Sequence, residues 1–175
     1  MGGGAQCAEG PGAAEEGEEG LRSAARLEAL PQVRLSASAD PGLERFARLV
    51  ADTLGVPVAL VSLVEADRQV FPGQVGLAEP WASGRQAPLA RLLCQRVAAT
   101  GSPLVLADAR QDEQARGTAA ISDPQVIAYA GMPLTDSEDH VLGSLCAIDI
   151  QPRAWSPREL ASLADLAAAC CAELR

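Results

Sequence analysis

Thiol side chains are the most reactive groups in this sequence, which has five cysteines and a single histidine among 175 residues. Cys94 falls in a helical pattern, and Cys146 in an apolar run typical of a central strand. The two thiols could form a redox pair, or Cys94 could be a reactive thiol if Arg91 or Arg96 supplied the positive neighbour that a thiolate needs. Free cysteine is more often a small buried apolar side chain. We favour that interpretation for both.

The other candidate groups give weaker patterns. Cys170 and Cys171 are adjacent on a helical segment, and a Cα separation of ~3.8 Å is too short for a disulfide between them. His140 stands in a polar turn, and no cysteine and histidine spacing fits zinc or a nucleophile with its base. Asp108 follows a short strand, where it could bind a cationic or hydroxylated ligand. It could equally cap the turn at Ala109.

The charge of the chain argues against two classes of partner. The formal net charge is −9, and the 14 basic residues are all arginine. Without a basic stripe, we expect no binding to nucleic acid or to an anionic membrane. No apolar run approaches the ~18 residues of a membrane span, and the N-terminus lacks a signal-peptide pattern. We therefore expect a cytoplasmic protein with reduced thiols.

The N-terminal part of the chain differs in composition from the rest. The first twenty residues contain five glutamates and much glycine and alanine, too little apolar side chain to offset the entropy of ordering. Leu21–Leu30 could form a short helix, but we interpret it as a linker. The expected organisation is a disordered acidic tail and linker over residues 1–33 and a single domain over 34–175.

Helices and strands then alternate along the chain. Asp40 and Ser156 are each followed by proline, as at helix N-termini, and Pro72 places its strand at a sheet edge because it cannot donate a ladder hydrogen bond. The expected elements are a helix from Asp40 to Leu54, strands over Val58–Val64 and Gln69–Val75, a helix from Leu89 to Val97 ended by Gly101, a strand over Pro103–Ala107, a polar loop with a helical turn over Asp108–Asp123, and a last helix from Ser156 to Leu174.

A hairpin organises these elements. Ile127–Leu134 and Val141–Ile150 are apolar runs on either side of a polar turn, and the second run predicts a strand in the middle of the sheet. Gly131 and Gly143 lie inside the strands, where glycine marks a bulge or a close approach to the backbone. Short connections between most strands predict an α+β fold, with a central antiparallel sheet and helices packed on its faces.

Five segments follow one another along the chain: LGVPVALVSLV (54–64), QVGLAEPWAS (74–83), YAGMPL (129–134), HVLGSLCAID (140–149) and WSPREL (155–160). Taken together and in this order, they resemble a bacterial GAF domain of the type found with histidine kinases, phosphatases and cyclases. The resemblance covers about three quarters of the chain. It implies a curved antiparallel sheet with a ligand pocket on one face and dimer-forming helices on the other. The ligand pocket implied by this resemblance would include Phe71, Trp81, Leu93, Cys94, Asp108, Tyr129, Gly131, Met132 and Cys146.

The resemblance fixes no ligand, so the cofactor is unknown. The signature of cyclic-nucleotide-binding relatives needs asparagine and lysine, which this chain lacks. Bilin-binding relatives commonly have histidine after the attachment cysteine, whereas Gln95 follows Cys94. Haem-binding relatives use a histidine, and His140 is expected in an exposed turn away from the pocket.

The function expected from this resemblance is a non-catalytic regulatory module that binds a small molecule. It would signal by helix-mediated homodimerisation or through a partner such as a kinase, phosphatase or cyclase. Wide apolar faces on the first and last helices, which one sheet face does not obviously cover, favour the homodimer. The alternatives are a ligand-free structural dimerisation domain and, less probable by the context of Cys94, a free methionine sulfoxide reductase of the same fold. Because no kinase, phosphatase or cyclase motif follows Leu174, we expect action through a partner or membership of a longer protein.

Overall fold

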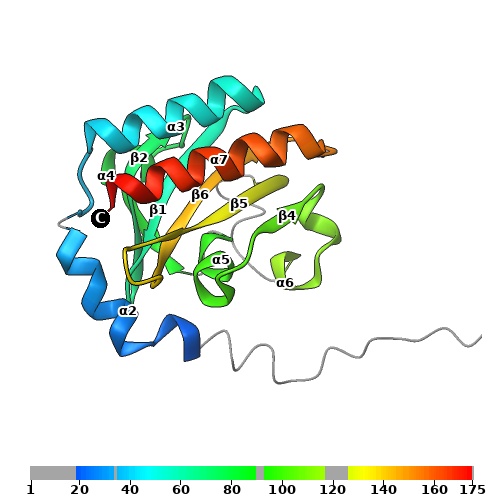
Figure 1. Cartoon of the computed structure of the whole chain (residues 1–175). Coiled ribbons are helices and arrows are strands. Elements are labelled where there is room, and N and C mark those ends of the chain that lie inside the picture. Colours follow the sequence, from blue (N-terminus) through cyan, green and yellow to red (C-terminus); the bar gives the residue numbers. More distant parts are fainter. Residues whose placement is uncertain (1–18, 34, 90–92, 117–125, 175) are drawn as a thin grey trace, which may run out of the picture.

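A six-stranded antiparallel sheet forms the centre of the molecule (Figure 1), and its strand order is β3-β2-β1-β6-β5-β4. The structure is a computed structural model that describes residues 19–33, 35–89, 93–116 and 126–174. Helices pack on both faces of the sheet, which confirms the predicted α+β class. The strands are β1 (Val58–Val64), β2 (Arg68–Val75), β3 (Gln86–Pro88), β4 (Leu104–Leu106), β5 (Ala128–Thr135) and β6 (Val141–Asp149).

The predicted hairpin is confirmed as β5 and β6. Strand β6 lies in the middle of the sheet, between β1 and β5. In its turn, the Asp136 carboxylate accepts hydrogen bonds from the backbone N–H groups of Glu138 and His140. Across the pair, Gly131 lies opposite Cys146 and Tyr129 opposite Ile148. This register places Tyr129, Gly131 and Cys146 on one face of the sheet and Met132 on the other.

Two long helices cover the opposite face and lie side by side there (Figure 1). Helix α3 (Pro41–Leu54) begins at Asp40, whose side chain accepts from the Leu43 N–H, and ends at Gly55 in the left-handed conformation. Helix α7 (Pro157–Glu173) begins with a capping box, in which Ser156 and Glu159 each accept from the other's backbone N–H. Both helices therefore start where the sequence predicts.

The apolar sides of these two helices are buried against the sheet and against each other. The buried core on this face includes Phe46, Val50 and Leu163 together with Leu145 of β6. One sheet face therefore does cover both helices, contrary to the premise from which a dimer was expected. Leu49 of α3, whose surface is 41% exposed, remains as an apolar contact point.

Shorter helical segments cover the face that carries the candidate site. Helix α5 (Cys94–Thr100) packs on β5, β6 and β1 and ends at Gly101 in the left-handed conformation. The loop after β4 forms the turns η3 (Ala109–Gln111) and α6 (Glu113–Arg116), and α4 (Trp81–Gly84) precedes β3. The start of α5 is later than the predicted Leu89, and residues 90–92 lie outside the described part of the chain.

The position of Pro72 requires a correction. Strand β2 is not at the edge of the sheet, because β3 pairs with its first residues, Arg68–Val70. Pro72 lies beyond that pairing, where Ser62 of β1 stands opposite two residues of β2 in a bulge. The missing N–H of proline is tolerated there. Three residues, two of them exposed, gave too little pattern to predict β3.

The linker interpretation also requires a correction. Ala24–Ala29 forms helix α2 and Leu30–Val33 the 3₁₀ turn η1, and this segment lies beside one end of the sheet (Figure 1). The buried Arg26 guanidinium donates to the Val64 carbonyl at 2.5 Å and to the Leu21 carbonyl at 2.8 Å. These bonds and the packing of Leu30 hold the segment. The prediction of disorder for residues 1–18 falls outside the described residues. No helix among the described residues is long and apolar enough to cross a membrane.

Candidate functional site

Polar side chains gather inside the core beneath α5. Ser62, Gln69 and Ser144 are three of the four polar or charged residues that the described part of the chain buries, and all three have no exposed surface. The Ser62 hydroxyl donates to the Gln69 side-chain carbonyl at 3.3 Å, and the Gln69 amide donates to the Leu89 carbonyl at 3.2 Å. The Ser144 hydroxyl is buried without a hydrogen-bond partner in the described structure.

Two thiols and a phenol lie in the same region. The sulfur atoms of Cys94, at the start of α5, and Cys146, in β6, are 3.7 Å apart. The Tyr129 hydroxyl donates to the Cys94 sulfur at 3.4 Å. All three side chains are fully buried. Hydrogen bonds from Cys146, and secondarily from hydroxyl groups such as that of Tyr129, lower the pKa of Cys94, whereas burial raises the pKa of Cys146 and of Tyr129.

Of the two arginines that could have served Cys94, Arg96 has another partner. Arg96 forms an ion pair with Asp112 at 2.9 Å, so its charge is compensated by another group. Arg91 lies outside the described residues. The shift in the pKa of Cys94 therefore rests on neutral hydrogen-bond donors.

The two strand glycines are explained by the protein itself. A Cβ atom on Gly131 would lie 2.5 Å from the Tyr129 hydroxyl oxygen, because the tyrosine ring occupies the space above that glycine. A Cβ atom on Gly143 would meet the Ser62 carbonyl of the neighbouring strand. Each glycine does mark a close approach to the backbone. The approaching group is the Tyr129 side chain at Gly131 and the neighbouring strand at Gly143, and not a ligand.

Most of the predicted pocket residues do come together, as one packed core. Phe71, Leu93, Cys94, Tyr129 and Cys146 belong to the same buried cluster. The partly buried Trp81 packs against this cluster from α4, and Gly131 lies beneath the Tyr129 ring.

Two predicted residues lie elsewhere. Met132 belongs to the core on the opposite face, under α3 and α7, since side chains alternate along a strand. Asp108 caps η3 by accepting from the Arg110 N–H, and it forms an ion pair with the Arg110 side chain at 2.8 Å. Of the two roles that the sequence left open for Asp108, the structure shows the cap.

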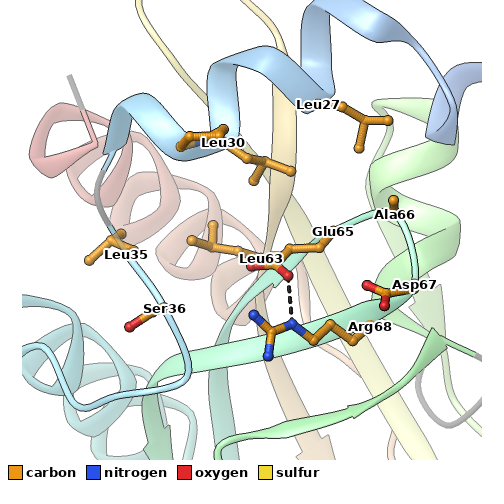
Figure 2. A pocket seen from close by; sticks show the side chains of 10 residues that line it. Leu27, Leu30, Leu35, Ser36, Leu63, Glu65, Ala66, Asp67 and Arg68 are labelled. Atoms are coloured by element: carbon orange, nitrogen blue, oxygen red, sulfur yellow. Dashed lines mark hydrogen bonds and ion pairs between the residues drawn. The ribbon is translucent and has the colours of Figure 1, made fainter.

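A cavity of about 440 Å³ lies at the end of the sheet, between the N-terminal helical segment and the β1–β2 turn. We call it the N-terminal cavity. Figure 2 shows leucine side chains of the α2–η1 segment facing Leu63 and the turn. Its lining residues are Leu27, Leu30, Pro31, Leu35, Ser36, Leu63, Glu65, Ala66, Asp67 and Arg68.

Charged groups line one side of the N-terminal cavity. Arg68 is held by Glu65, with 2.6 Å between the guanidinium and the carboxylate (Figure 2), and by the Gln86 side chain at 2.8 Å. The Asp67 carboxylate adds a second negative charge. A smaller cavity of about 130 Å³ lies near Val58 and Ile148, below the size range of usual small-molecule sites.

The model of the GAF domain family matches residues 39–174. This chain belongs to the GAF domain family. The match spans every strand of the sheet and both long helices. It leaves α2 and η1, and with them one wall of the N-terminal cavity, outside the family match.

Individual relatives of this GAF domain have diverse functions. A cyclic di-GMP phosphodiesterase from Pseudomonas aeruginosa is 32% identical over 120 residues, which are 68% of this chain but only 20% of that protein. The GAF domain of an Acinetobacter phosphoenolpyruvate-protein phosphotransferase is 21% identical, with a TM-score of 0.64 over 89% of this chain and 90% of that one. A free methionine-R-sulfoxide reductase from Neisseria meningitidis is 17% identical, with a TM-score of 0.62 over 98% and 95%. The two structural likenesses show the fold alone.

Sequence reasoning missed the N-terminal cavity of this GAF domain. Leu27 and Leu30 share one side of the short helix, and Arg26 beside them is buried. That leucine spacing was the available signal. A short helix over Leu21–Leu30 after a glycine-rich tail is also typical of a linker, which was the interpretation preferred from the sequence. No cluster of metal-ligating side chains is found among the residues that the structure describes.

Proposed function

We propose that this GAF domain is a non-catalytic regulatory module that binds a small, mostly apolar molecule in the N-terminal cavity. The observation that carries the proposal is the cavity itself. Its volume of about 440 Å³ lies within the ~300–1,000 Å³ of usual ligand pockets. The face beneath α5, where a pocket was expected, is filled by Tyr129 and its neighbours.

The lining indicates the chemical class of the ligand. Leucines from both walls and Pro31 make the interior apolar, which suits an apolar molecular body. Glu65 and Asp67 outnumber Arg68, whose guanidinium is already bound by Glu65 and Gln86. Together with the net charge of −9, this balance disfavours anions. The ligand's polar end is therefore neutral or cationic.

The position of the cavity supports a route for the signal. A ligand between η1 and the β1–β2 turn would hold both walls together, and residues 35–39 lead from η1 directly to Asp40, the cap of α3. Asp40 also donates its backbone N–H to the Pro72 carbonyl at 2.9 Å. Ordering of the N-terminal wall would therefore bias the start of α3. A ligand shifts an equilibrium only through such differential contacts.

The signal would leave through the α3 and α7 surface, by homodimerisation or to an effector such as a kinase, phosphatase or cyclase. The Pseudomonas relative, a cyclic di-GMP phosphodiesterase, supports a setting in cyclic-dinucleotide signalling. We do not assign the phosphodiesterase activity of that relative to this chain, because the match covers only 20% of that protein. A structural dimerisation domain without ligand is the alternative.

A thermal-shift screen tests the proposal. A library of apolar amines, alcohols and amides, with cyclic di-GMP and organic acids as anionic probes, is screened against the folded chain. A hit at a hundredfold excess over its Kd should stabilise the protein by ~2.7 kcal/mol. We expect hits among neutral and cationic compounds and none among anions.

A pair of matched variants locates the site. Ser36 lines the cavity, whereas Ser137 lies in the exposed β5–β6 turn and is not a lining residue. Ser36→Trp places a large ring at the mouth of the cavity and should abolish the shift, whereas Ser137→Trp should leave it intact. Absence of hits in a broad library would leave the structural dimerisation domain as the better explanation. A shift that survives Ser36→Trp would show that the ligand binds outside the N-terminal cavity.

A further inference from the structure

The thiols of Cys94 and Cys146 face each other from two elements that are distant in sequence. Cys94 is the first residue of α5, and Cys146 lies in the central strand β6. Their sulfur atoms are 3.7 Å apart, and neither residue has exposed surface. A disulfide has an S–S bond of about 2.05 Å. The sulfurs would therefore need to approach by less than 2 Å, a distance that side-chain rotation and a small shift of α5 supply.

The surroundings of the pair differ from those of an inert apolar thiol. The Tyr129 hydroxyl donates to the Cys94 sulfur. The Ser144 hydroxyl, two residues before Cys146 on the same face of β6, is buried without a hydrogen-bond partner among the described residues. Hydrogen bonds, first from Cys146, lower the pKa of Cys94, and burial raises the pKa of Cys146. These donors favour negative charge on Cys94.

The second cysteine pair lacks these features. Cys170 and Cys171 lie on α7 at the other face of the sheet. Burial, with secondary contributions from nearby charges, raises the pKa of Cys170 to about 12. The Cys171 sulfur accepts a hydrogen bond from the Thr135 N–H. Adjacent cysteines on a helix do not reach disulfide geometry, so this pair provides an internal control.

We propose that Cys94 and Cys146 form a reversible disulfide in response to hydrogen peroxide, which fastens α5 to the centre of the sheet. The oxidant is small enough to reach the pair when α5 opens transiently. This modification site is separate from the N-terminal cavity and requires no bound ligand.

The reaction proceeds in two balanced steps. The Cys94 thiolate attacks one oxygen of the peroxide, the O–O bond breaks, and the departing hydroxide takes up a proton to leave as water. Cys94 is then a sulfenic acid. The Cys146 sulfur attacks the Cys94 sulfur, the S–O bond breaks, and the oxygen leaves as a second water with the proton of the Cys146 thiol. Two thiols are oxidised to one disulfide, and one peroxide is reduced to two waters.

The product would change the domain at its centre. The disulfide links residues 52 positions apart in sequence, which constrains the unfolded chain and stabilises the folded one. It also removes the Cys94 thiol to which the Tyr129 hydroxyl donates. Oxidation would thus fix α5 on β6 and strengthen the packing that fills this face.

Peptide mapping tests the proposal on the full chain. Cys7, outside the described residues, is replaced by serine in all samples. The native protein is treated with one equivalent of hydrogen peroxide, alkylated in denaturant and digested. We expect a linked Cys94–Cys146 peptide and the loss of two alkylation sites, both reversed by dithiothreitol. Cys170 and Cys171 should remain fully alkylated.

Variants separate the roles of the two thiols. Cys146→Ser should stop the reaction at a Cys94 sulfenic acid, which dimedone traps, whereas Cys94→Ser should yield neither product. Cys170→Ser is the matched control and should oxidise as the parent does. Because the mapping is done on the parent protein, the test stands even if a variant fails to fold. Oxidation of Cys170 or Cys171 before Cys94, or a linked peptide that forms only in denaturant, would overturn the proposal.

Discussion

Replacing Gly131 by alanine tests whether Tyr129, and not a ligand, occupies the space above the hairpin. The added Cβ atom would lie 2.5 Å from the tyrosine hydroxyl oxygen and 2.7 Å from the ring atom Cε1. Ordinary contacts begin near 3.4 Å, so the ring must move by about 0.9 Å. Tyr129 has no exposed surface, so the ring must move within a packed core.

The expected cost follows from three terms. Overpacking a closed core destabilises by about 1–3 kcal/mol. Displacing the hydroxyl from the Cys94 sulfur removes a hydrogen bond worth about 0.5–1.5 kcal/mol. Alanine in a strand regains about 0.5–1 kcal/mol relative to glycine, because glycine loses more chain entropy on folding. Gly131→Ala should therefore lower the free energy of unfolding by about 2 kcal/mol.

Urea unfolding measures this cost. With an m-value of about 2 kcal/mol/M, the midpoint should fall by about 1 M. Gly84→Ala is the control, because its added Cβ atom meets nothing within 4 Å, and the change should stay within about 0.5 kcal/mol or be stabilising.

A second background isolates the contact with the ring. In a Tyr129→Leu protein the ring is gone, so Gly131→Ala should be neutral or stabilising there. The non-additivity between the two substitutions should reach about 1–3 kcal/mol. An equal cost of Gly131→Ala with and without the tyrosine ring would refute this account of the glycine.

Four further expectations can be measured. Ser156→Ala removes the α7 cap and should destabilise the fold by ~1 kcal/mol in urea unfolding; a change no larger than that of Ser137→Ala would contradict this. The hydrogen bond that His140 donates to the Asp136 carboxylate raises the pKa of His140 above its ordinary value of about 6.5. This bond therefore stabilises the fold fully below pH ~6.5, and the stabilisation is lost as pH rises through the raised pKa. An NMR titration of the single histidine should show the raised pKa falling in Asp136→Asn. Light scattering at micromolar concentration should give twice the chain mass, and a monomer would count against the homodimer. A coupled assay should detect no reduction of free methionine sulfoxide; activity that vanishes in Cys94→Ser would establish an enzyme instead.

The elements of the fold were predictable because local signals and the final packing agree. Asp40 and Ser156 are caps followed by proline, and the structure uses both as caps. The apolar runs of β1 and β6 predict central strands, and these two strands are neighbours in the middle of the sheet. Strand β3 lacks such a pattern, because it has three residues and two of them are exposed.

The candidate site was only partly predictable, because the ring of Tyr129 fills the space in which a ligand was expected. The hairpin glycines predict a close approach, but a sequence does not state what approaches. Tyr129 lies two residues before Gly131 on the same face of β5, and its ring fills the space itself. When an aromatic residue lies two positions from a glycine in a strand, its ring should be considered as the group that fills the space above the glycine before a ligand is inferred.

Strand β1 connects the two regions that we assign to regulation. Leu63 lines the N-terminal cavity, while Ser62, the residue before it, belongs to the buried polar cluster beneath α5. The Val64 carbonyl accepts from Arg26, so the same strand end also holds α2 in place. A ligand in the N-terminal cavity would act on the end of β1, and a Cys94–Cys146 disulfide would act on its neighbour β6. Because β1 and β6 each lie between two other strands, neither can shift without disturbing the hydrogen bonds on both of its sides. We therefore expect ligand binding and disulfide formation to be coupled through the stability of these strands and not through a large movement.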